Sequence, residues 1–277
     1  MSMTRPMEER TAKEYWETRL SERWGLHGVG HISFGLPYNE WLYRVRKQVF
    51  LRQIQPLSWD FKALAVLDVG SGTGFWLDQW KSLGVRSITG LDITRIAAEN
   101  LQETHPEARI LELDISDPEA PQKISQKFDV ISAFDVLFHI ADKDKFDVAI
   151  SNVAALLKPS GHFVFSDLLV HAQPTWTAQE VHRTLDTVTE VLAQQNLQIR
   201  RRVPMFVLMN SPFDASSRFL RYLWLLLMAP VRFLPALGSL YGAALYPLEL
   251  LLTNLLTESP TTEMVICQKG NDFPTNR

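Results

Sequence analysis

The chain has very little cysteine and very little net charge. Cys267 is its only cysteine, which excludes an internal disulfide and argues against thiolate metal sites and Cys-X-X-Cys redox motifs. A formal net charge of -3 over 277 residues gives no general electrostatic reason to bind nucleic acid or acidic lipid. The first ten residues lack the apolar core that a secretion signal needs, so we expect a cytoplasmic protein.

The sequence also lacks a cluster of residues that resembles a metal site. Asp142 and Asp144 are close together, but acidic residues are expected at the start of a helix in any case, because they complement the helix dipole. We therefore expect no metal ion and no magnesium-assisted chemistry.

From residue 63 onward, short apolar runs alternate with segments of helical spacing. With an apolar content of 46%, the chain can bury the core of one large domain. The apolar runs cover residues 63–67, 87–91, 108–113, 128–134 and 162–165. This alternation predicts an α/β fold with a doubly wound, mostly parallel sheet, in which ligands bind beyond the carboxyl ends of the strands.

The stretch from Val66 to Trp76 has the pattern of a strand, a glycine turn and the start of a helix. Gly70, Gly72 and Gly74 occupy alternate positions of the turn. Glycine adopts positive φ without penalty, and its missing Cβ lets a ligand touch the main chain. The helix that follows offers unpaired N–H groups to an anion. We expect a polar, negatively charged ligand group on this loop.

Aspartates follow two successive strands. Asp92 lies 18 positions after Gly74 at the end of the second strand, and Asp114 ends the third. A carboxylate near this spacing accepts both hydroxyls of a ribose, which points to a nucleoside-bearing cofactor. Either aspartate alone is equally well explained as the cap of the next helix. The pair, at successive strand ends of one sheet, favours the cofactor.

The glycine loop reads D-x-G-x-G-x-G from Asp68 to Gly74, whereas the dinucleotide fingerprint reads G-x-G-x-x-G. It resembles the first motif of class I S-adenosylmethionine-dependent methyltransferases of the small-molecule type. The resemblance covers residues 63–168 and includes residues 90–93, 113–115, 128–135 and 156–161. It implies a Rossmann-like sheet of seven strands, S-adenosyl-L-methionine as cofactor and S-adenosyl-L-homocysteine as product.

The resemblance also implies which residues contact the cofactor. The glycine loop and Asp68 surround its amino acid end, Asp92 accepts from the ribose hydroxyls, and Asp114 accepts from the adenine amino group. Tyr15 or Trp16 closes over the methionine carboxylate, although aromatic residues on such a helix more often pack than bind ligands. The residues predicted to bind the cofactor are Tyr15, Asp68, Gly70, Ser71, Gly72, Gly74, Asp92, Ile93, Asp114, Ile115 and Phe134.

The chemistry requires few protein groups, because the methyl group on a sulfonium is already activated. The enzyme must align the nucleophile, and an aliphatic hydroxyl also needs a base, whereas a carboxylate or phenolate needs little or none. His139, after the fourth strand, is the first candidate base, and Asp167, after the fifth, is the second. Packing or capping explains either residue as well. The further candidates are Asp135, His171 and His31.

The chain is expected to form one domain in four parts. Residues 1–60 form a helical cap, residues 61–209 the cofactor-binding core, residues 210–260 an apolar helical insertion before the last strand, and residues 261–277 that strand and a tail. These boundaries add N-terminal helices and one insertion to the α/β sheet.

The insertion is unusually apolar, but no run in it reaches the 20 or so residues of a membrane span. Charged residues and prolines interrupt it, namely Arg221, Pro230, Arg232, Pro235, Pro247 and Glu249. We expect two or three short helices that form a lid or wall beside the cofactor, and no transmembrane span. An apolar lid implies a lipophilic acceptor; a peripheral membrane contact and a dimer contact are the alternatives.

The sequence therefore predicts methyl transfer to an oxygen, hydroxyl or carboxylate, of a lipophilic small molecule such as a specialised metabolite, by a monomer or homodimer. The alternatives are an N-methyltransferase of a small amine or heterocycle, and a cofactor-binding partner protein without catalysis. Nucleic acid as a substrate is disfavoured, because there is no basic face and residues 135–138 lack the Asn/Asp-Pro-Pro-aromatic motif.

Overall fold

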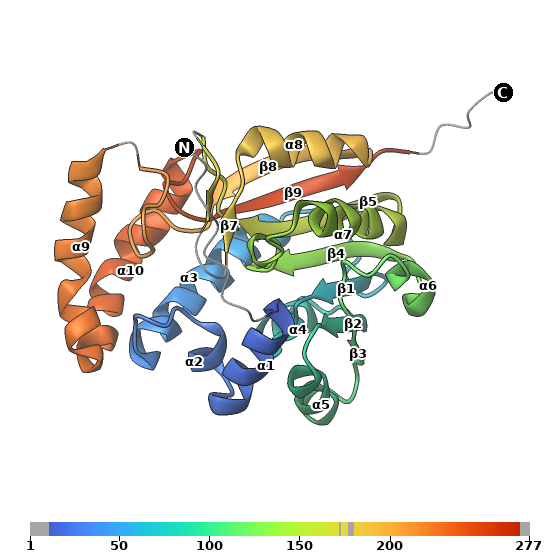
Figure 1. Cartoon of the computed structure of the whole chain (residues 1–277), viewed down its shortest axis with the longest axis horizontal. Helices are drawn as coiled ribbons and strands as arrows, with labels where there is room; N and C mark the ends of the chain where they lie inside the picture. Colours follow the sequence, from blue (N-terminus) through green and yellow to red (C-terminus); the bar gives the residue numbers. More distant parts are fainter. Residues whose placement is uncertain (1–10, 172, 177–179, 216, 272–277) are drawn as a thin grey trace.

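The apolar runs form one mixed sheet in the computed structural model, which describes residues 11–171, 173–176, 180–215 and 217–271 (Figure 1). The strand order is β3-β2-β1-β4-β5-β9-β8. The strand bounds are Ala65–Val69 (β1), Ser87–Asp92 (β2), Arg109–Glu112 (β3), Phe128–Phe134 (β4), Leu157–Asp167 (β5), Leu197–Pro204 (β8) and Glu263–Lys269 (β9). The pairs from β3 to β5 are parallel, and β9 is antiparallel to both of its neighbours. The predicted Rossmann-like, seven-stranded, mostly parallel sheet is confirmed.

Helices cover both faces of the sheet, because successive residues of each strand point to opposite faces and both sets are apolar. In β1, Val66 packs with Phe50 and Trp80 in one core cluster, whereas Leu67 packs with Phe146 and its neighbours in the other. The helices that contribute to the two clusters are α3 (Leu36–Ile54), α4 (Phe75–Ser82) and α5 (Arg95–Thr104) on the first face, and α6 (Ala120–Ile124), α7 (Lys143–Leu156) and α8 (Leu185–Gln194) on the second.

The N-terminal cap consists of α1 (Ala12–Glu22), α2 (Leu26–Val29) and the start of α3. Helix α1 begins with a capping box, in which the Thr11 hydroxyl accepts from the Glu14 N–H while the Glu14 carboxylate accepts from the Thr11 N–H. Helix α3 has Pro37 in its first turn, where a missing N–H removes no hydrogen bond. Together these start signals fix where the cap helices begin.

The insertion folds as α9 (Arg218–Phe233), a short 3-10 turn η2 (Pro235–Leu237) and α10 (Gly238–Leu255). The expectation that prolines divide it into short pieces is wrong at Pro230 and Pro247, which lie inside the two helices. A proline in a helix removes one N–H and bends the axis, but strong packing can carry the helix through it. Within the described residues, Pro235–Leu255 is the one helix long and apolar enough, by length and composition, to cross a membrane.

A short pair of strands, β6 (Thr175–Trp176) and β7 (Val181–His182), follows the fifth strand. Helix α8 begins after it, at Leu185, where the Thr184 hydroxyl caps the helix by accepting from the Thr187 N–H. The segment therefore turns back over the carboxyl ends of β4 and β5, where the 3-10 turn η1 (Leu137–His139) also lies.

Candidate active site

The glycine loop between β1 and α4 has the backbone geometry that only glycine adopts easily. Gly70, Gly72 and Gly74 have φ angles of 69°, 53° and 87°. The N–H groups of Gly70 and Ser71 donate to the Leu91 carbonyl of β2, with N···O distances of 2.6 and 3.0 Å. The loop is thus fixed against the neighbouring strand and leaves the start of α4 facing the cavity beside it.

Asp92 connects the loop to the next helix. Its Oδ2 accepts from the Gly72 N–H at 2.8 Å, and its Oδ1 accepts from the N–H and hydroxyl of Thr94 at 2.9 and 2.7 Å. Burial raises the pKa of Asp92, and these hydrogen bonds oppose the rise. Asp114, one strand further on, accepts in the same way from the N–H and hydroxyl of Ser116.

A cavity of about 970 Å³, counting its open mouth, lies beside these groups. Of the predicted cofactor-binding residues it is lined by Gly70, Ser71, Gly72, Asp92, Ile93, Asp114, Ile115 and Phe134. Asp92, Asp114 and Asp135 line it, together with His139, and no Lys or Arg does within the part of the chain that the structure describes. Carboxylates without a basic side chain fit a ligand that carries cationic groups and no phosphate, which suits a sulfonium and an amino group.

Asp68, predicted to surround the amino acid end of the cofactor, does not line the cavity. It lies fully buried beneath the loop, where Oδ1 accepts from the Ser132 hydroxyl at 2.6 Å. The Ser71 hydroxyl donates to the Asp68 carbonyl at 2.9 Å. Oδ2 of Asp68 has no hydrogen-bond partner among the described residues. Asp68 therefore lies beneath the loop and supports it through these contacts with Ser132 and Ser71.

The buried carboxyl of Asp68 makes stability depend on pH. Burial raises its pKa from an ordinary 3.8 to about 7, against hydrogen bonds from Ser132 and Ser71 that lower it. Because the folded state binds the proton more tightly, this group's contribution is fully present below about pH 4 and is lost as the pH rises through about 7. The loss is at most about 4 kcal/mol. Thermal unfolding of the wild type minus that of Asp68→Asn should show this decline, and a constant difference across the range would contradict it.

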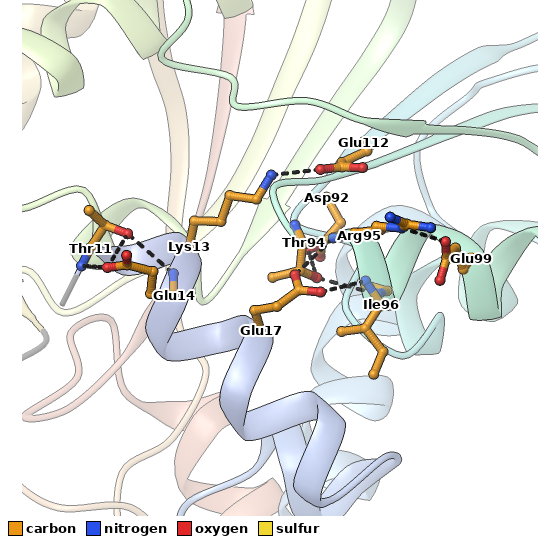
Figure 2. A network of polar contacts seen from close by, with 11 residues as sticks. Thr11, Lys13, Glu14, Glu17, Asp92, Thr94, Arg95, Ile96, Glu99 and Glu112 are labelled. Carbon is orange, nitrogen blue, oxygen red and sulfur yellow. Dashed lines mark hydrogen bonds and ion pairs between the residues drawn. The ribbon is translucent and has the colours of Figure 1, made fainter.

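Helix α1 lies across the adenosine side of the cavity and is held there by polar contacts (Figure 2). The Glu17 carboxylate accepts from the N–H groups of Arg95 and Ile96 at 2.9 and 3.1 Å, at the first turn of α5. Lys13 forms an ion pair with Glu112 of β3 at 2.6 Å. These contacts attach the cap helix to α5, which begins three residues after Asp92, and to the end of β3, two residues before Asp114.

Of the two aromatic residues on α1, Trp16 faces the cavity and Tyr15 does not. Trp16 shares one side of the helix with Leu20, four residues later, and both line the cavity. The Tyr15 hydroxyl instead accepts from Arg19 at 3.2 Å. Tyr15 thus lies outside the cavity lining, because one position along a helix turns a side chain by about 100°, and its contact with the cofactor stays a prediction.

The pair provides a matched test of the cap. Trp16→Ala should weaken binding of S-adenosylhomocysteine by roughly tenfold, because it removes a large apolar contact from the cavity. Tyr15→Ala should change the affinity by less than about twofold, because Tyr15 is half-buried but lies outside the cavity lining. Isothermal titration calorimetry measures both affinities. Equal effects of the two substitutions would contradict the assignment of Trp16 to the cavity wall.

The acceptor end of the cavity lies at the carboxyl end of β4. His139, in η1, lines the cavity with its ring edge-on to Trp16 at 5.0 Å between centroids. Asp135 also lines it, with φ at 58°, a left-handed conformation that costs energy outside glycine. The Asp135 carboxylate pairs with Arg46 of α3 at 2.8 Å and accepts from the Ser166 hydroxyl at 2.8 Å. Strained backbone held by two partners is typical of a functional site.

The other candidate bases lie outside the cavity lining. Asp167 is fully buried at the end of β5, where Oδ1 accepts from the Leu168 N–H and burial raises its pKa to about 6. Asp167 does not line the cavity, and its catalytic role stays a prediction. His171 pairs with Asp214 at 2.6 Å on the surface. Burial lowers the pKa of His31 to about 4, so this ring is neutral at physiological pH.

Sequence reasoning missed Arg46 and Glu180 as neighbours of the site. Arg46 lies between the rings of Tyr43 and Phe206 and holds Asp135. Burial works to raise the pKa of Glu180, but His182, His139 and His31 outweigh it, so the net pKa is lowered. The signal in the sequence for Arg46 was a positively charged residue among the apolar residues of the α3 segment. The residues around Glu180 offered no such signal.

No residue of the 210–260 insertion lines the cavity, so the expected lid over the cofactor is absent from the described part of the chain. The insertion packs on α3 instead. A Cβ on Gly242 would lie 2.3 Å from the Trp41 ring, and one on Gly238 would lie 2.7 Å from the Tyr38 nitrogen. Glycine at both positions lets α10 approach α3 closely, behind the cavity wall.

A model of a methyltransferase-domain family matches residues 38–214, which is more than half of the chain. The search for similar curated proteins found no match to this chain. The matched range contains the glycine loop, both strand-end aspartates and His139.

Solved structures share the fold across most of the chain. Magnesium protoporphyrin IX methyltransferase of Synechocystis PCC 6803, with bound S-adenosylmethionine, is 13% identical, with a TM-score of 0.56 over 93% of this chain and 95% of that one. An O-methyltransferase of a Brevibacillus brevis trans-AT polyketide synthase is 20% identical, with a TM-score of 0.55 over 86% and 80%. The N-methyltransferase NodS of Bradyrhizobium japonicum WM9 is 14% identical, with a TM-score of 0.55 over 95% and 100%. At these identities the likeness shows the fold alone.

Proposed function

The chain belongs to the methyltransferase-domain family, with S-adenosyl-L-methionine as its methyl donor, and from this premise we propose that it methylates an oxygen of a lipophilic small molecule. The cofactor supplies a methyl group activated on a sulfonium. The observation that carries the proposal is His139, which lines the cavity beside Asp135 and against Trp16. A titratable ring is useful to a hydroxyl acceptor and unnecessary for a carboxylate or phenolate.

In this proposal His139 takes the proton from the acceptor hydroxyl. At the same time the hydroxyl oxygen bonds to the methyl carbon of the cofactor, and the bond between that carbon and the sulfur breaks. The lowered pKa of Glu180 keeps that carboxylate ionised, and the charge of His139 is among the causes of the lowering. Trp16 and Leu20 exclude water from the cavity, which favours a lipophilic acceptor. The polar groups thus concentrate at the reacting end of an otherwise apolar wall.

His139→Ala should lower turnover of an aliphatic alcohol acceptor by about 100-fold or more, because general base catalysis is lost. Turnover of a carboxylic acid acceptor should fall much less, since that oxygen is already ionised. Formation of S-adenosylhomocysteine with a panel of lipophilic acceptors measures both. His171→Ala, a histidine on the surface, is the matched control. Alcohol turnover near that of the wild type in His139→Ala would remove the base from the proposal.

The acidic lining supports N-methylation as a second candidate function. Asp92 and Asp114 line the cavity, and no Lys or Arg among the described residues does, so these two carboxylates favour a cationic acceptor as well as the cofactor. An amine loses its proton to solvent before it reacts, so its methylation should survive in His139→Ala. Turnover of amines and not of alcohols would select this function. No S-adenosylhomocysteine with any acceptor would indicate a binding protein.

A further inference from the structure

Helices α9 and α10 lie at one end of the molecule (Figure 1). Many of their apolar side chains are exposed. The side chains of Phe219, Leu226 and Phe233 are 72%, 73% and 83% exposed. Single exposed apolar side chains are ordinary, but a contiguous set of this kind marks an interaction surface. The exposed apolar residues of the two helices are Phe219, Leu220, Tyr222, Leu223, Leu225, Leu226, Phe233, Leu240, Leu248, Leu251 and Leu255.

Helix α9 has three distinct sides. Trp224, Met228 and Val231, spaced four and three residues apart, are buried against the domain. The opposite side carries Tyr222, Leu226 and Phe233, spaced four and seven residues apart, and it is apolar throughout. The flank between them carries Arg218, Arg221 and Arg232, all exposed. An apolar side next to an arginine flank is the pattern of a helix that lies in a membrane interface.

Helix α10 is bound to the domain along one stripe. Gly238, Gly242, Glu249 and Thr253 are buried, and Arg52 of α3 donates to the Thr253 carbonyl at 2.9 Å. The Glu249 carboxylate accepts from three successive main-chain N–H groups, at residues 207–209. If α10 crossed a bilayer, it would lose these contacts and place the Glu249 carboxylate in lipid without its hydrogen-bond donors. We therefore infer that α10 stays on the domain. Its outer side, with Leu240, Leu248, Leu251 and Leu255, remains free to enter lipid.

The charge on this surface has one sign. From residue 217 to residue 257 the sequence contains three arginines and a single acidic residue, Glu249, whose carboxylate is buried and hydrogen-bonded. The whole chain is slightly acidic, so the positive charge of residues 217–257 is local. Arginines beside exposed apolar residues complement anionic lipid headgroups. In a symmetric pair of chains the same arginines would face one another, which disfavours a second copy as the partner.

We propose that α9 and α10 bind the domain peripherally to an anionic membrane, with the outer sides of both helices inserted among the headgroups and first methylenes. Interfacial helices enter the bilayer by about 5–10 Å, which the side chains of Leu226 and Phe233 can reach without unfolding either helix. The exposed apolar residues Ile32 and Leu36 extend this surface. They flank Gly35, which packs closely on the insertion, since a Cβ added to it would lie 2.6 Å from Pro235. The loop that bears His31 therefore reaches the membrane side of the domain. A lipophilic ligand could then pass from lipid to protein without crossing water.

Flotation of the full chain with vesicles tests the proposal. Vesicles of phosphatidylcholine with phosphatidylglycerol should bind the wild type at least about tenfold more tightly than phosphatidylcholine alone, because each arginine near an anionic surface contributes. Tyr222→Ser with Leu226→Ser and Phe233→Ser should abolish binding to both. Arg218→Gln with Arg232→Gln should remove the preference for phosphatidylglycerol. Arg221 is left in place, since it donates to the Ala215 carbonyl.

Matched controls separate the surface from general effects of charge and apolarity. Trp24→Ser removes an exposed apolar residue outside the insertion, and Arg86→Gln with Lys145→Gln removes two positive charges elsewhere; neither should change vesicle binding. Light scattering without vesicles reports the oligomeric state. A stable dimer that Leu226→Ser dissociates, together with no vesicle binding, would overturn the proposal and assign the surface to a second copy. Binding that resists alkaline carbonate would overturn it in favour of a spanning helix. Vesicle binding is independent of methyl transfer, so either proposal can fail alone.

Discussion

Asp92→Ala should weaken binding of S-adenosylhomocysteine by at least about 100-fold, because we propose that Asp92 accepts from both ribose hydroxyls and each hydrogen bond to a charged group contributes about 1.5–3 kcal/mol. The substitution has a second effect on the same ligand. Asp92 holds the Gly72 N–H at 2.8 Å, so its loss also frees the glycine loop that the cofactor contacts. Calorimetric titration of the purified protein measures the affinity, and circular dichroism confirms that the protein is folded.

Glu112→Ala is the matched control for Asp92→Ala. Glu112 is the register partner of Asp92 in the adjacent strand, but its carboxylate forms an exposed ion pair with Lys13 and lies outside the cavity lining. An exposed pair contributes less than about 1 kcal/mol, so the affinity should change by no more than about threefold. Folded Asp92→Ala protein with the affinity of this control would disprove the role of Asp92.

Glu249→Ala should lower the free energy of unfolding by about 3–5 kcal/mol, the largest stability effect that we expect from one substitution. The Glu249 side chain is fully buried, and its two oxygens accept from the N–H groups of Val207, Leu208 and Met209 at 2.7, 2.8 and 3.1 Å. Alanine leaves those donors without acceptors and opens a cavity between α10 and the end of β8. Differential scanning calorimetry should show a melting temperature lower by about 5–10 °C.

Two further variants give this prediction its comparison. Glu249→Gln keeps the shape of the side chain and one acceptor oxygen. It should lower the free energy of unfolding by about half as much as Glu249→Ala, because one amide oxygen replaces two carboxylate oxygens. Glu258→Ala, whose carboxylate is exposed and pairs with Arg202 at 3.0 Å, should cost less than about 1 kcal/mol. A Glu249→Ala protein that melts like Glu258→Ala would show that the three N–H groups find other partners.

The sheet and the cofactor side of the site were accessible from the sequence because both follow local rules. Buried parallel strands read as continuous apolar runs, and their carboxyl ends meet at one edge of the sheet. Asp92 and Asp114 could therefore be assigned together without knowing any contact. Asp68 did not follow this rule: it is buried like Asp92, but it lies beneath the loop and does not line the cavity.

The cap and the insertion were less accessible because their roles depend on packing between distant segments. Tyr15 and Trp16 are equally aromatic neighbours, and the docking of Glu17 on α5 decides which of them enters the cavity. The apolar content of residues 210–260 suggested a lid, but Gly238 and Gly242 direct α10 against α3. Close approach through glycine has no hydrophobic signature, so sequence patterns cannot locate it.

The last strand of the chain occupies an inner position of the sheet. β9 hydrogen-bonds to β5 on one side and to β8 on the other. While the ribosome has not yet released Glu263–Lys269, both neighbours present open edges that can pair with other nascent chains. The sheet is therefore completed only when Glu263–Lys269 has been synthesised and placed between β5 and β8.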